Sequence, residues 1–228
     1  MAHTFDEYVD CIKRNCEECR PYEADPLYEP PVVELQANQH GTLALNGRNT
    51  EAWIMTQSGR MFFFENPHPR SIVIEDIAHA LAQICRFTGH VRCHYSVAEH
   101  SIRVSYLAEQ KYGRKFAKEG LLHDAAEAYV SDLNGPLKRL IGEGYKKWEG
   151  IAEDAVGKVF GFATPKSPEV KDCDGVIYLT EKRDLFPPYN LPFTSYPDKE
   201  PLPDPIIPMS AELARLLFLH RFEEVKSW

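Results

Sequence analysis

The segment GLLHDAAEAYVSD, residues 120–132, limits the possible folds of this chain most. In it His123 and Asp124 are adjacent within an apolar stretch whose pattern predicts a helix. Leucines and alanines flank the pair on both sides, which predicts that it lies in the core. Removing an unpaired charged group from water costs several kcal/mol or more. A surface pair at a helix end is the alternative, but the flanking residues favour a buried pair with a partner such as a metal ion.

Two further polar residues interrupt apolar helical faces. In YSVAEHSIRVSYLAEQ, apolar residues recur at three- and four-residue spacing, and His100 falls among them. In EVKDCDGVIYLTEKRDL, Asp174 takes the same position on a second such face. A single buried histidine is more often a core residue than a ligand, so the prediction depends on the set. Two histidines and two aspartates from three predicted helices should all point inward.

This set of side chains predicts a metal site. Two neutral imidazoles and two carboxylates suit a divalent transition ion such as Mn, Co, Fe, Ni or Zn, and Mg is also conceivable. If the ion is octahedral, four protein ligands leave two positions for water and a substrate oxygen, as hydrolysis requires. We therefore expect one divalent ion of open identity, with His100, His123, Asp124 and Asp174 as its ligands.

The order of these residues resembles the H…HD…D signature of the HD-domain metal-dependent phosphohydrolases, and the resemblance runs from about residue 76 to 185. Within that superfamily the chain is similar to the YfbR-like 5'-deoxynucleotidases and their phage relatives, some of which hydrolyse deoxynucleoside triphosphates. An isolated HD dipeptide is common, but the ordered set of motifs is specific. The motifs that carry the likeness are Arg86-Phe87 in ICRFTGH, VAEH ending at His100, Glu127 in HDAAEA, Asp132 in SDLNGPLK, and Lys171 with Asp174 in KDCD.

The resemblance implies roles for the remaining site residues. Arg86 would hold a phosphate through its planar fork of donors and offset charge in the transition state. Glu127 would handle protons, and Asp132 would lie at the leaving 5' oxygen. Phe87 stands where the bacterial enzymes pack a tryptophan against the sugar, and Lys138 is a nearby basic group for the substrate. Glu127 could instead be an exposed helix charge, and Asp132 could be only a turn residue.

The expected function is metal-dependent hydrolysis of a 2'-deoxynucleoside 5'-monophosphate to a deoxynucleoside and phosphate. The alternative is a triphosphohydrolase that acts on a dNTP, for example dATP, and shapes a phage precursor pool. Three phosphates need more positive charge than Arg86 alone supplies. The number of basic groups at the site therefore distinguishes the monophosphatase from the triphosphohydrolase. We disfavour a non-catalytic nucleotide-binding protein, because every predicted metal ligand and Glu127 are present. We also disfavour a cyclic-nucleotide phosphodiesterase.

The composition limits the kinds of partner that this chain is expected to bind. The net charge of -8 argues against nucleic-acid polymers and anionic membranes, which favour a basic face, so the expected partner is a small nucleotide. No apolar run approaches the roughly 18 residues that cross a bilayer, and no signal-peptide pattern opens the chain. The six cysteines then indicate reduced thiols in a cytoplasm, which is the host's if the gene is a phage's. The last predicted helix is either part of the core or a contact between subunits of a homo-oligomer.

The predicted fold is mostly α, an HD-domain helical bundle with a small β-hairpin near its N-terminal side. Residues 1–50 are expected to form a helix at 4–19 and an irregular arm, and 51–186 the hairpin and the phosphohydrolase core. Residues 187–228 should add a Pro-rich loop and a C-terminal helix to the same domain. The hairpin is predicted in WIMTQSGRMFFF around Ser58-Gly59. Helices are expected at 74–85, 95–112, 114–130, 135–141, 143–162, 168–186 and 210–226.

Overall fold

In the computed structural model, helices account for most of the described residues, which are 35–37, 43–45, 48–49, 52–188 and 196–228. The predicted mostly α fold with a small hairpin is confirmed. All described residues fall within one unit, Val33–Trp228. The predicted helix at 4–19 lies outside them. No helix in this part of the chain is both long and apolar enough to span a membrane.

The helices begin at residues that the sequence marks as caps. The side chains of Ser96, Asn134, Ser167 and Ser210 each accept a hydrogen bond from the backbone N–H three residues later. The α-helices are α2 Ile74–Gln83, α3 Val97–Tyr112, α4 Ala117–Leu122, α5 Glu127–Val130, α6 Gly135–Ile141, α7 Glu143–Phe160, α8 Pro168–Leu185 and α9 Ala211–Val225. Short 3-10 turns lie at η2 Pro69–Ser71, η3 Arg86–Gly89 and η4 Arg114–Phe116.

The predicted single helix at 114–130 is wrong, because α4 ends at Leu122 and α5 begins at Glu127. Between them the backbone makes tighter turns, in which each N–H bonds to the carbonyl three residues before it, as from Glu127 to Asp124. The His123 ring supplies a physical reason, since its Nδ1 lies 2.8 Å from the Gly120 carbonyl oxygen that a continuous helix would pair with the Asp124 N–H. His123 and Asp124 therefore lie in a turn.

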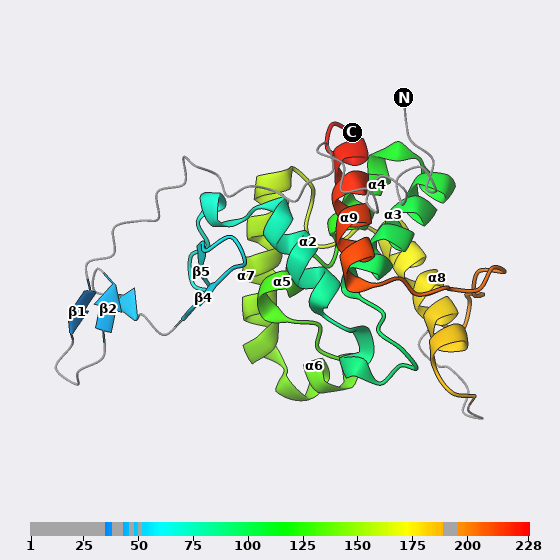
Figure 1. Cartoon of the computed structure of the whole chain (residues 1–228), viewed down its shortest axis with the longest axis horizontal. Helices are drawn as coiled ribbons and strands as arrows, with labels where there is room; N and C mark the ends of the chain where they lie inside the picture. Colours follow the sequence, from blue (N-terminus) through cyan, green and yellow to red (C-terminus); the bar gives the residue numbers. More distant parts are fainter. Residues whose placement is uncertain (1–34, 38–42, 46–47, 50–51, 189–195) are drawn as a thin grey trace. The chain divides into compact units, whose positions relative to one another are not determined.

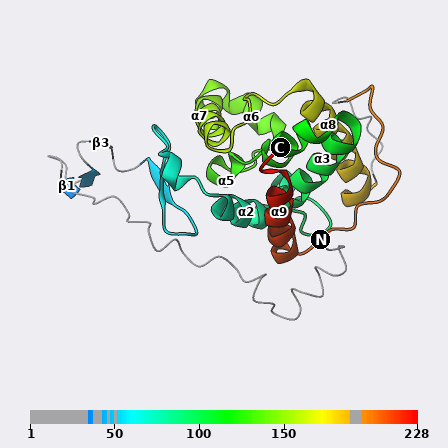
Figure 2. The ribbon, with the colours of Figure 1, turned by 90° about the horizontal axis from the view of Figure 1, so that it is seen from above.

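Helix α3 is the centre of the bundle and packs against α2, α4, α8 and α9 (Figures 1 and 2). Gly120 permits the close approach of α4, because a Cβ there would lie 3.1 Å from the Cα of Ser105 and 3.3 Å from the Cβ of Ala108. This contact and the α3–α8 contact together bring both α4 and α8 against α3.

The predicted hairpin is confirmed as β4 (Trp53–Met55) and β5 (Met61–Phe63), which pair antiparallel with Ile54 opposite Phe62. Its turn uses Gly59 at a φ of 81°, a conformation that glycine adopts without a Cβ penalty. The Phe62 ring is fully buried and stacks on Tyr129, with the ring centroids 3.9 Å apart. The hairpin is thereby fixed to the core beside α5.

Three further short strands fall within the segment predicted to be irregular. These are β1 (Leu35–Ala37), β2 (Leu43–Leu45) and β3 (Arg48–Asn49), which form an antiparallel sheet in the order β1-β2-β3. The expectation of a wholly irregular arm is wrong at these residues. The high content of turn-forming residues in this segment is equally compatible with short strands joined by turns.

Substitution of Phe62 tests how the hairpin is attached. Phe62→Ala should lower the free energy of unfolding by about 3 to 5 kcal/mol, because it removes a buried ring and leaves a cavity against Tyr129. Met55→Ala on the partner strand is the matched control, since Met55 is 71% exposed and its loss should cost less than about 0.5 kcal/mol. Urea unfolding followed by circular dichroism measures both. Equal stability of the two variants would show that the hairpin is not part of the core.

Candidate metal centre

Three of the four predicted ligands, His100, His123 and Asp124, form one group, and Asp174 contacts it through His100. His100 comes from α3, His123 and Asp124 from the turn after α4, and Asp174 from α8. The His100 Nε2 atom lies 3.3 Å from His123 Nε2, 3.3 Å from Asp174 Oδ1 and 3.6 Å from Asp124 Oδ2. His123 Nε2 lies 3.1 Å from Asp124 Oδ2. Both imidazoles are buried.

The partners of the other ring nitrogens set the tautomer of each histidine. His100 Nδ1 lies 2.6 Å from a carboxylate oxygen of Glu181, and His123 Nδ1 lies 2.8 Å from the Gly120 carbonyl. Both partners can accept a hydrogen bond, so each Nδ1 carries a proton and each Nε2 faces the cluster. Burial and Arg86 lower the pKa of His100, but Glu181 and the hydrogen bond to Asp174 raise it to about 9, so without a metal ion this ring is protonated and its Nε2 donates to Asp174. The two Nε2 atoms and the carboxylate of Asp124 then face one another, and a metal ion could bind between them in place of the proton on His100 Nε2.

The spacing of these atoms fits a metal ion. Ligands about 2.1 Å from an ion, at angles between octahedral and tetrahedral, are separated by roughly 3.0 to 3.4 Å. The observed separations of 3.1 to 3.6 Å are close to that range. His100, His123 and Asp124 form a group that could hold a metal ion, with the outer nitrogen of each histidine oriented by a hydrogen bond as in known metal sites.

Lys166 lies against the carboxylates of the cluster. Its Nζ donates to Asp174 Oδ2 at 2.9 Å and to Asp124 Oδ1 at 3.3 Å. Burial raises the pKa of Asp174, but Lys166 and the hydrogen bond from His100 outweigh it, and the pKa lies well below its ordinary value. The carboxylate is therefore ionised at neutral pH, as a metal ligand must be.

Arg86 reaches the cluster from the opposite side. It begins η3, and its backbone N–H bonds to the Tyr95 carbonyl, which fixes this segment beside the start of α3. The guanidinium lies 3.6 Å from Asp124 Oδ2 and donates to Glu181 Oε2 at 3.2 Å. Burial lowers the pKa of Arg86, but Glu181 and the nearby aspartates raise it above its ordinary value, so the group remains charged.

Glu127 is buried beside this arrangement. Burial, with Asp124 next in importance, raises the pKa of Glu127 well above its ordinary value. Its Oε2 atom has no hydrogen-bond partner among the described residues, and the same holds for Nε of Arg86. A buried acceptor and a buried donor without partners are rare in folded proteins and commonly mark a functional site.

The remaining predicted site residues lie around the cluster. Asp132 is half-buried and close enough to Arg86 and Glu127 to raise the pKa of both. Lys138 contacts Glu149 at 2.6 Å and Glu127 at 3.6 Å. Phe87 lies against the Arg86 guanidinium, with the centroid of its ring 5.2 Å from the central carbon of that group. Its ring packs edge-on against Phe186, with the centroids 5.0 Å apart.

Phe87 and Thr88 both adopt a φ of 57°, which side chains with a Cβ rarely take. Two successive residues in this left-handed region cost energy that the surrounding structure must offset. They directly follow Arg86, so the strained backbone lies where the guanidinium enters the cluster. Such strain is concentrated at ligand-binding segments of proteins.

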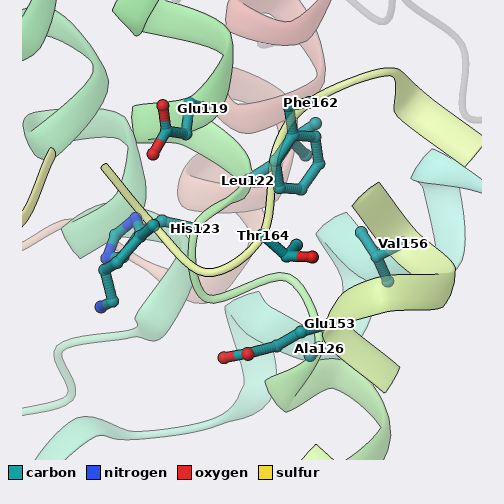
Figure 3. A pocket seen from close by; sticks show the side chains of 9 residues that line it. Glu119, Leu122, His123, Ala126, Glu153, Val156, Phe162 and Thr164 are labelled. Atoms are coloured by element: carbon teal, nitrogen blue, oxygen red, sulfur yellow. The ribbon is translucent and has the colours of Figure 1, made fainter. Parts of the chain in front are cut away.

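His123 is one of the residues that line a small cavity of about 10 Å³ (Figure 3). It has room for about one water molecule. Its polar lining comes from Glu119, Glu153, Thr164 and Lys166 together with His123 itself. This volume is too small for a nucleotide.

Sequence reasoning did not identify Glu181 or Lys166. Glu181 lies seven residues after Asp174 on α8, two helical turns along the same face, so the spacing that identified Asp174 could have found it. Lys166 lies in the loop between α7 and α8, after the cis peptide bond Thr164–Pro165. No periodic signal marks a residue in such a loop.

Comparison with known proteins gives two relatives, and no family model matches the chain. The chain is 37% identical over 179 residues to the uncharacterized protein YfdR of Escherichia coli (strain K12), which covers 76% of this chain and 96% of that protein. It is 40% identical over 115 residues to the uncharacterized protein RCAP_rcc00048 of Rhodobacter capsulatus, over 48% of this chain and 59% of that protein.

A metal titration tests the cluster. Metal-stripped protein should bind one divalent ion per chain, and His123→Ala should lose this binding, because the variant removes an Nε2 lone pair from a group of converging ligands. His90→Ala is the control, since His90 is exposed and outside the cluster. Isothermal titration with Mn, Co and Zn, together with elemental analysis, measures both. Unchanged stoichiometry and affinity in folded His123→Ala would remove His123 from the site.

Proposed function

We propose that this chain, which belongs to the family of the Escherichia coli protein YfdR, is a metal-dependent phosphohydrolase of nucleotides. The observation that carries the proposal is the convergence of His100, His123, Asp124 and Asp174 beside a buried arginine. Ordered as H…HD…D, these residues resemble the HD-domain phosphohydrolases. The proposed substrate is a 2'-deoxynucleoside 5'-monophosphate, and the products are the deoxynucleoside and phosphate.

The proposed ligands of the ion are the two Nε2 atoms and one oxygen each of Asp124 and Asp174. A bound divalent ion would supply Lewis acidity, polarising a phosphoryl oxygen and acidifying water. Asp174 is included because its Oδ1 lies 3.3 Å from His100 Nε2 and its pKa is held low by Lys166. Lys166, bonded to both carboxylates, offsets part of their charge, so that an anionic substrate can approach them.

Arg86 is proposed to bind the phosphate. Its guanidinium is buried, charged and 3.6 Å from a carboxylate of the cluster, and its Nε has no partner among the described residues. A phosphate oxygen at the cluster would therefore meet a donor that burial has separated from water. Hydrogen bonds between charged partners are roughly twice as strong as neutral ones.

Glu127 is proposed to accept the proton of the attacking water. Its buried Oε2 has no partner among the described residues, and burial raises its pKa above the ordinary value, which suits a group that exchanges a proton. Asp132 is proposed to lie at the 5' oxygen that leaves, because its negative charge is close to both Arg86 and Glu127. Phe87, in its strained segment next to Arg86, is proposed to border the sugar.

The charges around the cluster favour a monophosphate over a triphosphate. Arg86 and Lys166 contact its carboxylates, and Lys138 contacts Glu127 beside it. Each of these cations already pairs with carboxylates within the described residues. A triphosphate would need positive charge beyond these pairs. The dNTP triphosphohydrolase is therefore the second candidate, and product analysis separates the two.

Product analysis tests the proposed reaction. Metal-stripped protein is incubated with dNMPs, NMPs and dNTPs after Mn, Co, Mg, Fe, Ni or Zn is restored, and the products are separated by ion exchange. We expect orthophosphate and deoxynucleoside from the dNMPs. Tripolyphosphate from a dNTP would establish the second candidate instead. If no nucleotide is hydrolysed with any ion, or if His123→Ala hydrolyses them equally well, the proposed function is wrong.

Substitution of Glu127 tests its proton-handling role. Glu127→Gln keeps the size of the side chain but removes the basic oxygen, so turnover should fall at least about 100-fold with metal affinity retained. Glu143→Gln is the control, because the Glu143 side chain is 90% exposed and its ion pair within the described part of the chain is with Lys146. Turnover of Glu127→Gln within a few-fold of the control would assign proton handling to another group, such as Asp132.

A further inference from the structure

Glu181 on α8 lies between the candidate metal centre and Arg86. It is fully buried, and its two oxygens have different partners. Oε1 lies 2.6 Å from Nδ1 of His100, and Oε2 accepts a hydrogen bond from Nη2 of Arg86 at 3.2 Å. One carboxylate therefore contacts both a predicted metal ligand and the predicted phosphate-binding group.

We infer that Glu181 is a positioning residue that holds the His100 ring ready to bind the metal and the Arg86 guanidinium ready to bind phosphate. The inference rests on the proposed function and goes beyond it. A carboxylate has two acceptor oxygens and no donor, so it can serve two donors simultaneously. With a proton fixed on Nδ1, His100 Nε2 is directed at the cluster, where it can give up its own proton and bind a metal ion.

The role requires a carboxylate, because an amide can serve only one of the two donors. Glutamine at 181 would present one oxygen and one NH₂ group. Arg86 cannot give up a proton, whereas an imidazole can move its proton from one nitrogen to the other. We therefore expect the amide oxygen to face Arg86 and the NH₂ to face His100. That pairing places the imidazole proton on Nε2, which can no longer bind a metal.

Saturating metal would impose the opposite arrangement. His100 must then return its proton to Nδ1, so the amide oxygen turns to His100 and the NH₂ group meets the Arg86 guanidinium. Two donors in contact repel, and the arginine is displaced from its position. The substitution should thus weaken metal binding and, once metal is saturating, raise KM for the phosphate substrate more than it lowers kcat.

The experiment compares wild type, Glu181→Gln and Glu99→Gln. Glu99 is the matched control, because it is also a fully buried glutamate, but it pairs with Arg103 and the Met209 backbone N–H. Titration of metal-stripped protein with Mn or Co gives the affinity without any substrate. For Glu181→Gln we expect a loss of roughly 10- to 100-fold, the effect typical of partners that orient a metal ligand. Glu99→Gln should keep the wild-type affinity.

A second variant covers the case in which Glu181→Gln does not fold. Glu181→Asp keeps the buried charge that Arg86 and His100 require, but it is one methylene shorter and cannot reach both. It should therefore fold and still bind metal more weakly or show a raised KM. Wild-type metal affinity and wild-type KM in either folded variant would overturn the inference. A wild-type protein that binds metal but hydrolyses no nucleotide would refute the proposed function, while the metal titration still tests Glu181.

Discussion

The Nε2 atoms of His100 and His123 lie with the carboxylates of Asp124 and Asp174 at one side of α3, and this arrangement is the constraint on which the rest of the site depends. Buried carboxylates are strongly unfavourable unless cations lie beside them, and Lys166 and Arg86 do so here. The close contact of α3 and α4 at Gly120 brings His100 and His123 within 3.3 Å. The break in the helix after Leu122 leaves the Gly120 carbonyl to orient the second imidazole.

Charged groups surround this centre in a definite order. Lys166 holds the outer oxygens of the two aspartates on one side, and Arg86 approaches Asp124 from the other. Glu181 joins Arg86 to His100 through a buried carboxylate. The resulting site has cations beside its carboxylates, which suits an anionic substrate such as a phosphate ester. The protein carries a net charge of -8, so this local arrangement, rather than overall charge, must attract the substrate.

Much of the fold could be predicted because its signals are periodic. The buried faces of α3 and α8 repeat every three to four residues, so His100 and Asp174 stand out among apolar neighbours. The turn at His123 could not be predicted, because a side-chain hydrogen bond to Gly120 interrupts a pattern that looks continuously helical. Lys166 was missed for a related reason, since its position depends on how a loop packs and not on spacing along a helix.

Anomalous diffraction from crystals of the Mn- or Zn-loaded protein tests the metal centre most directly. We expect one anomalous peak bonded to Nε2 of His100 and Nε2 of His123 at about 2.0 to 2.2 Å, with Asp124 and Asp174 supplying oxygen ligands. Nδ1 of His100 should remain on Glu181. A peak elsewhere in the protein, or an ion bonded through Nδ1 of either histidine, would contradict the proposed arrangement.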